Sequence, residues 1–582
     1  MKELNNKLIN IKNKIFEKKE GFIIIAIVII SLFALYYPGF IYTHDGIIHL
    51  YRTAGFFENI KNGDFFNRIY YNGIGGQGYG WGIFYPPLSA GIPALFMCLG
   101  FSLFTSEKLF IIGTSILAGL FSYKLFKELY KNNYCAMLTS IIYVLSPYKI
   151  NQALIRGAMG EILIFTFLPL VFLGLIKIFK GEGKYKYLFI IGMVGVVYSH
   201  IISIVYTTLF AGLFVLFNYK KLMNKEVIKD LIISSIFIIL LSLPILYPIL
   251  QHQQSKDYII SNTETDVADR VVHAGQLISS NIVGKEAECT PYYSNATEMN
   301  YMLGPVFIVI LLVMPFMYKK IKENNKDCKL WIYFILLFIS IFMMLYKGIW
   351  NQLEVLDVIQ FPWRILLYSV FFMSIISGYV LKELLDEKNK YLVFMFVVSY
   401  SLLFVFMIGN KVQVAKTINT EFDFSKQTIS ENDDYGTYSF SIGYGHEYLP
   451  NATTTEVIKE KKNNIDVISG DCLIENKSFE KNILKFDVDN YNEETEIELP
   501  LVYYHGYEIE VENIDTGKIE SKLDYQMSEK GYIKVKINKL GKTRIKAKYK
   551  GTTLYRILDV IAIITAIVLI ISCLRLRFKK EK

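Results

Sequence analysis

Runs of about twenty uncharged, apolar residues recur along this chain from residue 21 to residue 411, and one more lies near the C-terminus. A helix of this length matches the hydrocarbon core of a bilayer, which is ~30 Å thick. The pattern therefore predicts a polytopic α-helical membrane protein. The predicted apolar segments are 21–43, 83–104, 107–126, 134–150, 161–179, 186–200, 201–218, 228–250, 301–318, 329–347, 364–383, 391–411 and 554–575.

The distribution of lysine predicts how many of these segments cross. Both ends of the chain are rich in lysine or arginine, which predicts that both termini are cytoplasmic and that the number of crossings is even. The thirteen segments are an odd number, so one of them does not cross fully. If segment 83–104 crossed, the lysines of residues 124–131 would lie outside, and this segment contains Pro86, Pro87 and Pro93. We interpret this segment as re-entrant, which leaves about twelve crossings. The alternative is that the lysine pattern misleads here and that the segment crosses fully.

The C-terminal third changes from long apolar runs to a period of two. Apolar and polar residues alternate over residues 483–488, 506–512, 532–537 and 543–549, with Gly, Asn and Asp between them. This pattern is typical of antiparallel strands and predicts a small β-sandwich. The predicted domains are a cytoplasmic leader (1–20), a transmembrane domain (21–411) with outer loops 44–82 and 251–300, an extracytoplasmic β-rich domain (412–551), and a final transmembrane helix with a basic cytoplasmic tail (552–582).

Composition agrees with a multi-pass protein of the plasma membrane. Of the 582 residues, 53% are hydrophobic, and the mean hydropathy is +0.33. The net charge of +9 is explained by lysine-rich inner loops that face anionic lipid, so we do not expect nucleic acid as a partner.

The first cluster of ionisable residues directly follows the first apolar segment. Asp45, His49 and Arg52 are spaced so that a helix would place them on one face. Ionisable groups at a membrane surface are costly unless they are used or solvated. A plainer explanation is an interfacial helix with Asp45 at its positive N-terminus. A divalent metal site made by His44, Asp45 and His49 also stays open, because the spacing permits one without being diagnostic.

Three further polar clusters fall on the same, outer side of the membrane in this topology. They contain Arg156 and Glu161, His200, and the group Gln360, Trp363 and Arg364. Arginines that reach the interface, and a buried histidine with satisfied hydrogen bonds, are alternative explanations for single members. Together the clusters predict one polar cavity, which suits a substrate that is half lipid and half polar, such as a polyprenyl-phosphate sugar.

The same residues carry a family resemblance. The succession HDG…H…R (44–52), GYG…FYPPL (78–88), RGAMGE (156–161), SH (199–200) and QFPWR (360–364) resembles the bacterial 6-pyruvoyl-tetrahydropterin-synthase-related membrane proteins, close to the YfhO-like proteins. The wider resemblance is to the GT-C superfamily of glycosyltransferases. It implies a GT-C-like transmembrane fold and no pterin chemistry.

The resemblance also implies roles for individual residues. Asp45 matches the acidic residue that acts as general base in an inverting transfer, and Arg364 and Arg156 are candidates for holding the donor phosphate. His49, Glu161 and His200 would orient the acceptor or the base. The supporting residues of the candidate site are His44, Arg52, Gln360 and Trp363. Many GT-C enzymes have two adjacent acidic residues, whereas His44 precedes Asp45 here, which leaves the base and any metal dependence open.

The sequence thus predicts a membrane glycosyltransferase that moves a sugar from a polyprenyl-phosphate donor to an envelope polymer, lipid or protein. A transporter or flippase of lipid-linked saccharides is one alternative. Transporters often have interrupted helices in two related halves, but only one interrupted segment is found here. A non-catalytic envelope scaffold is the other alternative.

Overall fold

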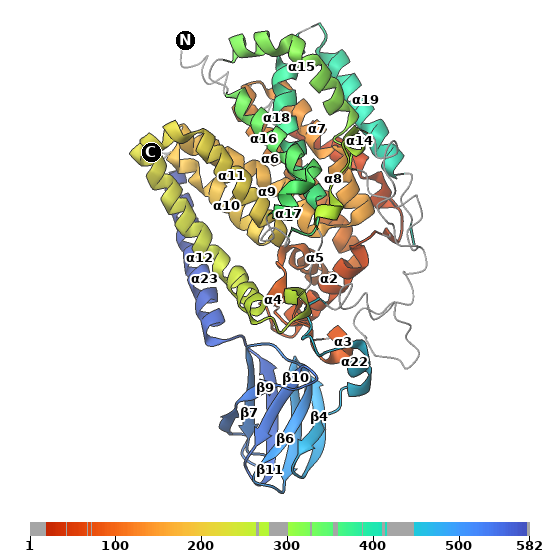
Figure 1. The fold of residues 1–582 in the computed structure, drawn as a ribbon, viewed down its shortest axis with the longest axis vertical. Helices are drawn as coiled ribbons and strands as arrows, with labels where there is room; N and C mark the ends of the chain where they lie inside the picture. Colours follow the sequence, from red (N-terminus) through yellow and green to blue (C-terminus); the bar gives the residue numbers. More distant parts are fainter. Residues whose placement is uncertain are drawn as a thin grey trace.

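The computed structural model describes residues 19–41, 43–66, 68–71, 73–262, 267–278, 301–325, 329–352, 359–386, 388–409, 414–415 and 447–578. Most of the predicted leader, the second half of the predicted outer loop 251–300 and the first part of the predicted β domain lie outside these residues. The described part of the chain is a helical domain followed by a β domain at one end (Figure 1).

Helices make up most of the described chain up to residue 409. A first helix covers residues 19–31 of the described chain. The others that build the domain are α2 (Gly46–Lys61), α5 (Leu88–Cys98), α6 (Leu103–Tyr130), α7 (Asn133–Val144), α8 (Pro147–Asn151), α9 (Met159–Phe179), α10 (Lys186–Val197), α11 (Ile201–Phe217), α12 (Lys225–Ser255), α15 (Pro305–Asn324), α16 (Leu330–Leu345), α18 (Leu366–Leu384) and α19 (Lys390–Gly409). After the β domain, α23 (Thr553–Phe578) returns and packs beside α12 (Figure 1).

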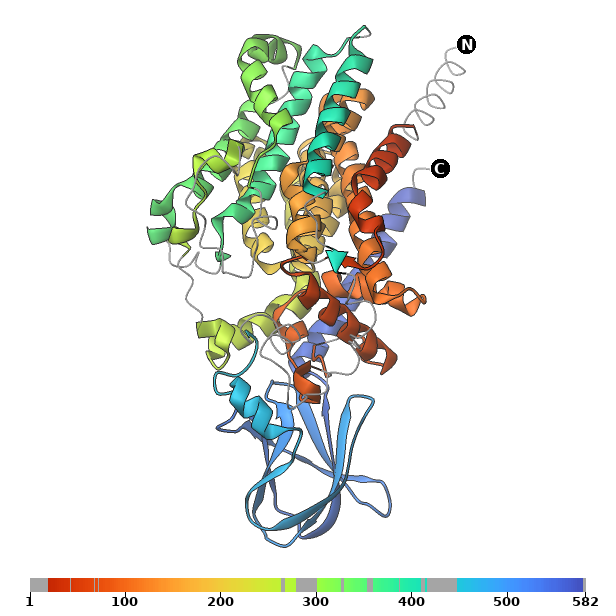
Figure 2. The same cartoon turned by 90° about the vertical axis from the view of Figure 1, so that its right-hand side faces the viewer.

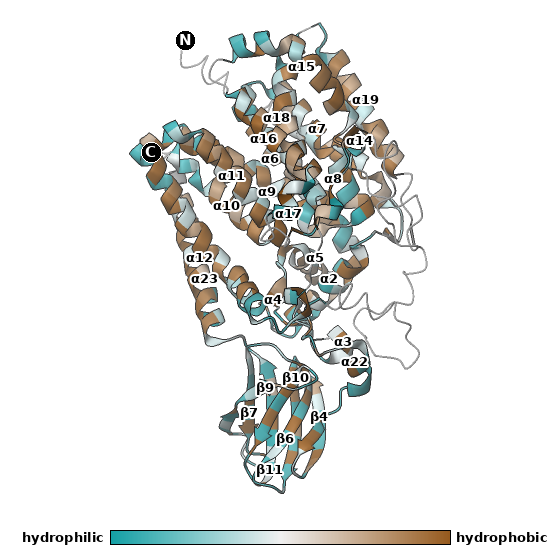
Figure 3. Ribbon diagram, in the orientation of Figure 1, coloured by the Kyte–Doolittle hydropathy of each residue, from teal (hydrophilic) through white to brown (hydrophobic). Residues whose placement is uncertain are grey.

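Within the described residues, six helices are long and apolar enough to cross a membrane. They are Leu103–Tyr130, Met159–Phe179, Lys225–Ser255, Pro362–Leu384, Lys390–Ile408 and Thr553–Arg575. Figure 3 shows long apolar stretches on α12, α23 and α19. These helices support a membrane protein with a C-terminal β domain, as predicted.

The predicted count of about twelve crossings is not supported. Several apolar runs form helices that are too short to span ~30 Å at ~1.5 Å per residue. Residues 134–150 divide into α7, of 12 residues, and α8, because Pro147 starts a new helix. The predicted segments 186–200 and 201–218 form α10, of 12 residues, and α11, of 17 residues. The segment predicted to be re-entrant contains α5, whose 11 residues extend only about 17 Å.

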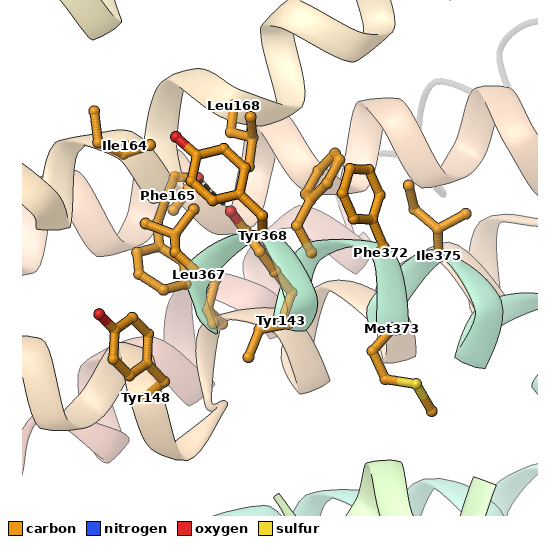
Figure 4. Packing of buried hydrophobic residues seen from close by; sticks show 14 of the residues in the cluster. Tyr143, Tyr148, Ile164, Phe165, Leu168, Leu367, Tyr368, Phe372, Met373 and Ile375 are labelled. Atoms are coloured by element: carbon orange, nitrogen blue, oxygen red, sulfur yellow. Dashed lines mark hydrogen bonds between the residues drawn. The ribbon is translucent and has the colours of Figure 1, made fainter. Parts of the chain in front are cut away.

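The core of the helical domain is built from large side chains of α7, α9 and α18. Figure 4 shows Tyr143, Phe165 and Phe372 packed together with their neighbours. Each buried phenol needs a hydrogen-bond partner, and Tyr143 donates to the Phe165 carbonyl oxygen over 3.0 Å. Helix α9 is buried along most of its length, so its N-terminus, where Glu161 lies, is held rigidly.

The β domain consists of two antiparallel sheets, which confirms the predicted sandwich-like unit. One sheet has the strand order β3-β6-β10-β9, and the other has the order β4-β5-β11-β7-β8. The strands are β3 (Asp466–Ser469), β4 (Cys472–Glu480), β5 (Ile483–Asn490), β6 (Thr495–Val502), β7 (Tyr507–Glu512), β8 (Ile519–Leu523), β9 (Tyr525–Met527), β10 (Tyr532–Ile537) and β11 (Gly541–Tyr549). The four strands predicted from alternation correspond to β5, β7, β10 and β11.

The β domain is fixed to the helical domain through the loop after α2. The Val502 amide donates to the Gln77 carbonyl oxygen over 2.9 Å, and the Tyr532 hydroxyl donates to the Gln77 side chain over 2.5 Å. Asn463 donates to the Gly75 carbonyl oxygen over 2.7 Å. The two units therefore share a continuous interface beside α2, which carries the first predicted cluster.

Candidate functional site

The backbone around Asp45 is attached to the turn that carries Arg156. The His44 and Asp45 amides donate to the carbonyl oxygens of Ile155 and Arg156 over 3.1 and 2.8 Å. The acceptor turn is the π-helical η2 (Gln152–Arg156), which ends at Gly157 with φ +69°. A Cβ at Gly157 would lie 2.2 Å from the Thr43 hydroxyl oxygen, so only glycine allows this close approach. Two segments more than one hundred residues apart thus meet at the candidate site.

Asp45 does not act as a helix cap. It occupies the N-cap position of α2, but its carboxylate makes no capping hydrogen bond. Instead, its Oδ2 lies 3.4 Å from Arg156 Nε. The Asp45 side chain is 37% exposed, whereas that of Arg156 is 9% exposed. Asp45 therefore lies at the helix N-terminus, as the plainer explanation expects, but its carboxylate contacts Arg156 and is open to an incoming group on one side.

Glu161 lies between the two arginines predicted to bind phosphate. Its side chain is only 2% exposed, and Arg156 donates to Oε1 over 2.6 Å. Arg364 Nε lies 3.0 Å from the same oxygen. The Tyr148 hydroxyl donates to Oε2 over 3.4 Å. One buried carboxylate therefore orients two guanidinium groups.

The segment before α18 positions Arg364 and supports both arginines. Arg364 also donates to the Gln360 side chain over 3.0 Å and to the Ile359 carbonyl oxygen over 3.2 Å. Gln360 has φ +63°, a strained conformation for a side-chain-bearing residue. The Arg156 guanidinium packs over the Trp363 ring, and the distance from its central carbon to the ring centroid is 4.6 Å. Gln360 therefore contacts Arg364, and Trp363 contacts Arg156.

Two histidines complete the buried side of the site. His200 Nε2 lies 3.8 Å from Glu161 Oε1, and its Nδ1 is 2.9 Å from the Ser203 hydroxyl. His49 is buried on α2, and its Nδ1 has no hydrogen-bond partner in the described structure. Burial, together with the charges of Arg52 and Arg156, holds the pKa of His49 well below its usual value. His49 is therefore neutral near pH 7 and can accept or donate one hydrogen bond.

Arg52 stacks on two aromatic rings of the loop after α2. Its guanidinium carbon is 4.7 Å from the centroid of Tyr85 and 5.0 Å from that of Trp81. These two rings stack on each other with centroids 5.7 Å apart. The glycine- and aromatic-rich motif around residues 78–88 thus builds an aromatic wall of the site.

Glu447 is a site residue that the sequence did not indicate. Burial raises the pKa of its carboxyl group, Arg52 opposes this effect, and the Asp45 carboxylate reinforces it. The next residue, Tyr448, packs on Tyr79 and stacks on Phe84, which brings Glu447 to the aromatic wall. The site therefore contains three carboxylates, Asp45, Glu161 and Glu447, together with three arginines.

The structure brings together Asp45, Arg156, Glu161, His200 and Arg364 as predicted, with His49 and Arg52 on the adjoining face of α2. Within the part of the chain that the structure describes, no three His, Cys, Asp or Glu side chains are grouped to hold a metal ion. The alternative of a site made by His44, Asp45 and His49 therefore has no geometric support. No family model matches this chain, and no curated protein matches it.

Proposed function

We propose that this chain is an inverting membrane glycosyltransferase that uses a polyprenyl-phosphate sugar donor. The observation that carries the proposal is the pairing of a half-exposed carboxylate, Asp45, with a buried Arg156–Glu161–Arg364 cluster. A proton acceptor and a cationic phosphate-binding group then lie side by side at one end of the apolar helices. This is the arrangement that the resemblance to YfhO-like and GT-C proteins implies.

In the proposed reaction, Asp45 takes the proton of the acceptor hydroxyl. The acceptor oxygen forms a bond to the anomeric carbon as the bond between that carbon and the phosphate oxygen breaks. The electron pair of the broken bond goes to the lipid phosphate, and the configuration at the anomeric carbon inverts. A positioned general base contributes typically ~10²–10⁴-fold to the rate.

The two buried arginines stabilise the leaving phosphate. Their shared partner, Glu161, neutralises one positive charge of the pair, and Asp45 lies 3.4 Å from Arg156. When Asp45 takes up the acceptor proton it loses its negative charge, which leaves the second positive charge for the leaving phosphate. Arginine suits this role because its planar fork matches two phosphate oxygens. Stabilising charge that develops in the transition state is usually the largest single catalytic contribution.

The proposal places the site outside the cytoplasm. The N- and C-terminal ends of the described chain lie at the end of the helical domain opposite the β domain (Figure 2). Lysines gather at that end, which supports a cytoplasmic location for it. The β domain would then cover the outer end, where it would help to bind the acceptor polymer, lipid or protein.

The test is the Asp45→Asn variant in a transfer assay. Purified protein is incubated with labelled polyprenyl-phosphate sugars and envelope extract, and glycosidic product is measured. At equal protein concentration, we expect product formation to fall at least ~10²-fold, because the amide cannot accept the proton. Asp515→Asn, an exposed aspartate of the β domain, is the matched control and should retain wild-type activity. Unchanged product with Asp45→Asn would refute the base assignment, and no product with wild-type protein would refute the transferase.

A further inference from the structure

A large cavity lies at the end of the helical domain opposite the candidate site. Its volume is about 1480 Å³, and it is lined by the ends of α6, α9 and α18, by the starts of α7, α10 and α19, and by the helix of residues 19–31. Glu161 of the candidate site and Lys177 of the cavity lie near opposite ends of α9. They are sixteen residues apart, which corresponds to about 24 Å along the helix. The cavity is thus separate from the site described above.

The rim of this cavity is strongly basic. Six lysines line it against three carboxylates, so the lining carries an excess of positive charge. The lysines are Lys19, Lys124, Lys127, Lys131, Lys177 and Lys390.

A single carboxylate sits at the centre of the basic cluster. Glu128 pairs with Lys131 at 2.8 Å, Lys177 at 2.8 Å and Lys180 at 2.7 Å. Lys177 has a second acidic partner, Glu182, at 3.1 Å. Three ammonium groups therefore share two carboxylates, and an anion that enters the cavity meets a cluster with unbalanced positive charge.

The walls of the cavity are apolar. Ile23, Met137, Leu170, Leu173 and Ile191 contribute hydrocarbon surface below the lysines. Ile191 is 42% exposed on α10, so this wall continues onto the outside of the helical domain. A water-soluble anion would leave the apolar surface without a partner, whereas a lipid would cover it with its chain.

We propose that this cavity binds an anionic lipid, with its phosphate among the lysines and its hydrocarbon chain along the apolar wall. Basic pockets between transmembrane helices on the cytoplasmic side bind lipid phosphates by this combination of contacts. The volume exceeds the ~300–1,000 Å³ of ordinary small-molecule pockets, as a lipid headgroup with the start of its chains requires. The cavity is at the end of the helical domain that the proposed topology places on the cytoplasmic side of the membrane. Lipid binding there does not depend on sugar transfer.

The test measures lipid binding to the full chain in detergent by native mass spectrometry. Phosphatidylglycerol should bind saturably, and phosphatidylcholine with the same acyl chains should bind much more weakly. Lys124→Gln/Lys131→Gln should weaken phosphatidylglycerol binding about 30-fold, because each lysine near a lipid phosphate contributes about fivefold. The control Lys220→Gln/Lys221→Gln removes the same charge from exposed positions outside the cavity and should leave binding unchanged.

Three results would overturn the proposal. Equal binding of the two lipids would show that the lysines do not select the phosphate charge, and this comparison needs only the wild-type protein. If the control variant lost as much phosphatidylglycerol binding as Lys124→Gln/Lys131→Gln, the effect would be one of general charge at that end of the molecule. Glycerol phosphate that binds as tightly as phosphatidylglycerol would show that the apolar wall does not hold a chain.

Discussion

Two arginines that share one buried carboxylate are an energetically unfavourable arrangement in an apolar domain. Burying an ion cluster costs desolvation energy, and such clusters are often no more stabilising than apolar side chains of the same volume. Glu161 lies at 2% exposure between Arg156 and Arg364, at the N-terminus of a helix that is largely apolar. We therefore interpret the cluster as functional, with Glu161 as a positioning residue for the two arginines.

Glu161→Gln tests this role. The change keeps the volume but leaves Arg364 without its carboxylate partner and Arg156 with only the half-exposed Asp45, so we expect about 3–5 kcal/mol of destabilisation. Thermal unfolding in detergent measures the loss. Glu226→Gln removes an exposed partner of Lys229 and should cost less than about 1 kcal/mol. An unchanged unfolding temperature for Glu161→Gln would contradict the buried ion cluster.

Some site residues could be predicted from the sequence and others could not. The spacing of Asp45, His49 and Arg52 indicated a shared helix face, and α2 confirms the helix while placing Asp45 directly before it. Glu447 follows Asp45 by about four hundred residues and has no local pattern that distinguishes it from other glutamates of the β domain. Its place depends on how the β domain packs, which no local rule predicts.

Hydrophobic runs predicted where the helices lie better than how long each one is. A run of apolar residues does not show where one helix ends, and the break at Pro147 turns a predicted span into two short helices. Alternation predicted β5, β7, β10 and β11 correctly. It missed β6, whose residues are nearly all buried, and β4, which is largely exposed, because neither has a clear period of two.

Gly157→Ala tests the connection between α2 and η2. The added Cβ would clash with the Thr43 hydroxyl at a backbone φ of +69°, so we expect about 1–3 kcal/mol of destabilisation. Transferase activity should fall as well, because Asp45 is held by this connection. Gly212→Ala is the matched control, since a Cβ there meets nothing within 4 Å and helical alanine is favoured over glycine. Equal thermal stability of the two variants would contradict the tight approach.

At the scale of the whole molecule, a buried ion pair joins the first loop to the last helix, next to the end of the β domain. Arg68 donates to both oxygens of Asp559 over 3.0 and 2.6 Å, and the two side chains are 7% and 6% exposed. Arg68 also lies 5.3 Å from the ring of Tyr555. Close to this contact, the Tyr71 hydroxyl donates to the Tyr549 carbonyl oxygen. Together with the hydrogen bonds at Gln77 and Gly75, this contact sets where the β domain sits relative to the candidate site.

Breaking the pair should release the β domain without unfolding the helical domain. Arg68→Ala or Asp559→Ala leaves one buried charge without its partner, which costs about 3–5 kcal/mol at this interface. Limited proteolysis should then cut the chain near residues 550–553 faster than in the wild type. Arg68→Met/Asp559→Leu removes both charges and should restore much of the resistance to the protease, since apolar replacements of a buried pair are often neutral.

Lys536→Ala, from an exposed pair with Glu494, is the control and should leave the cleavage rate unchanged. If both single variants resist the protease as the wild type does, the ion pair is not needed to hold the β domain in place.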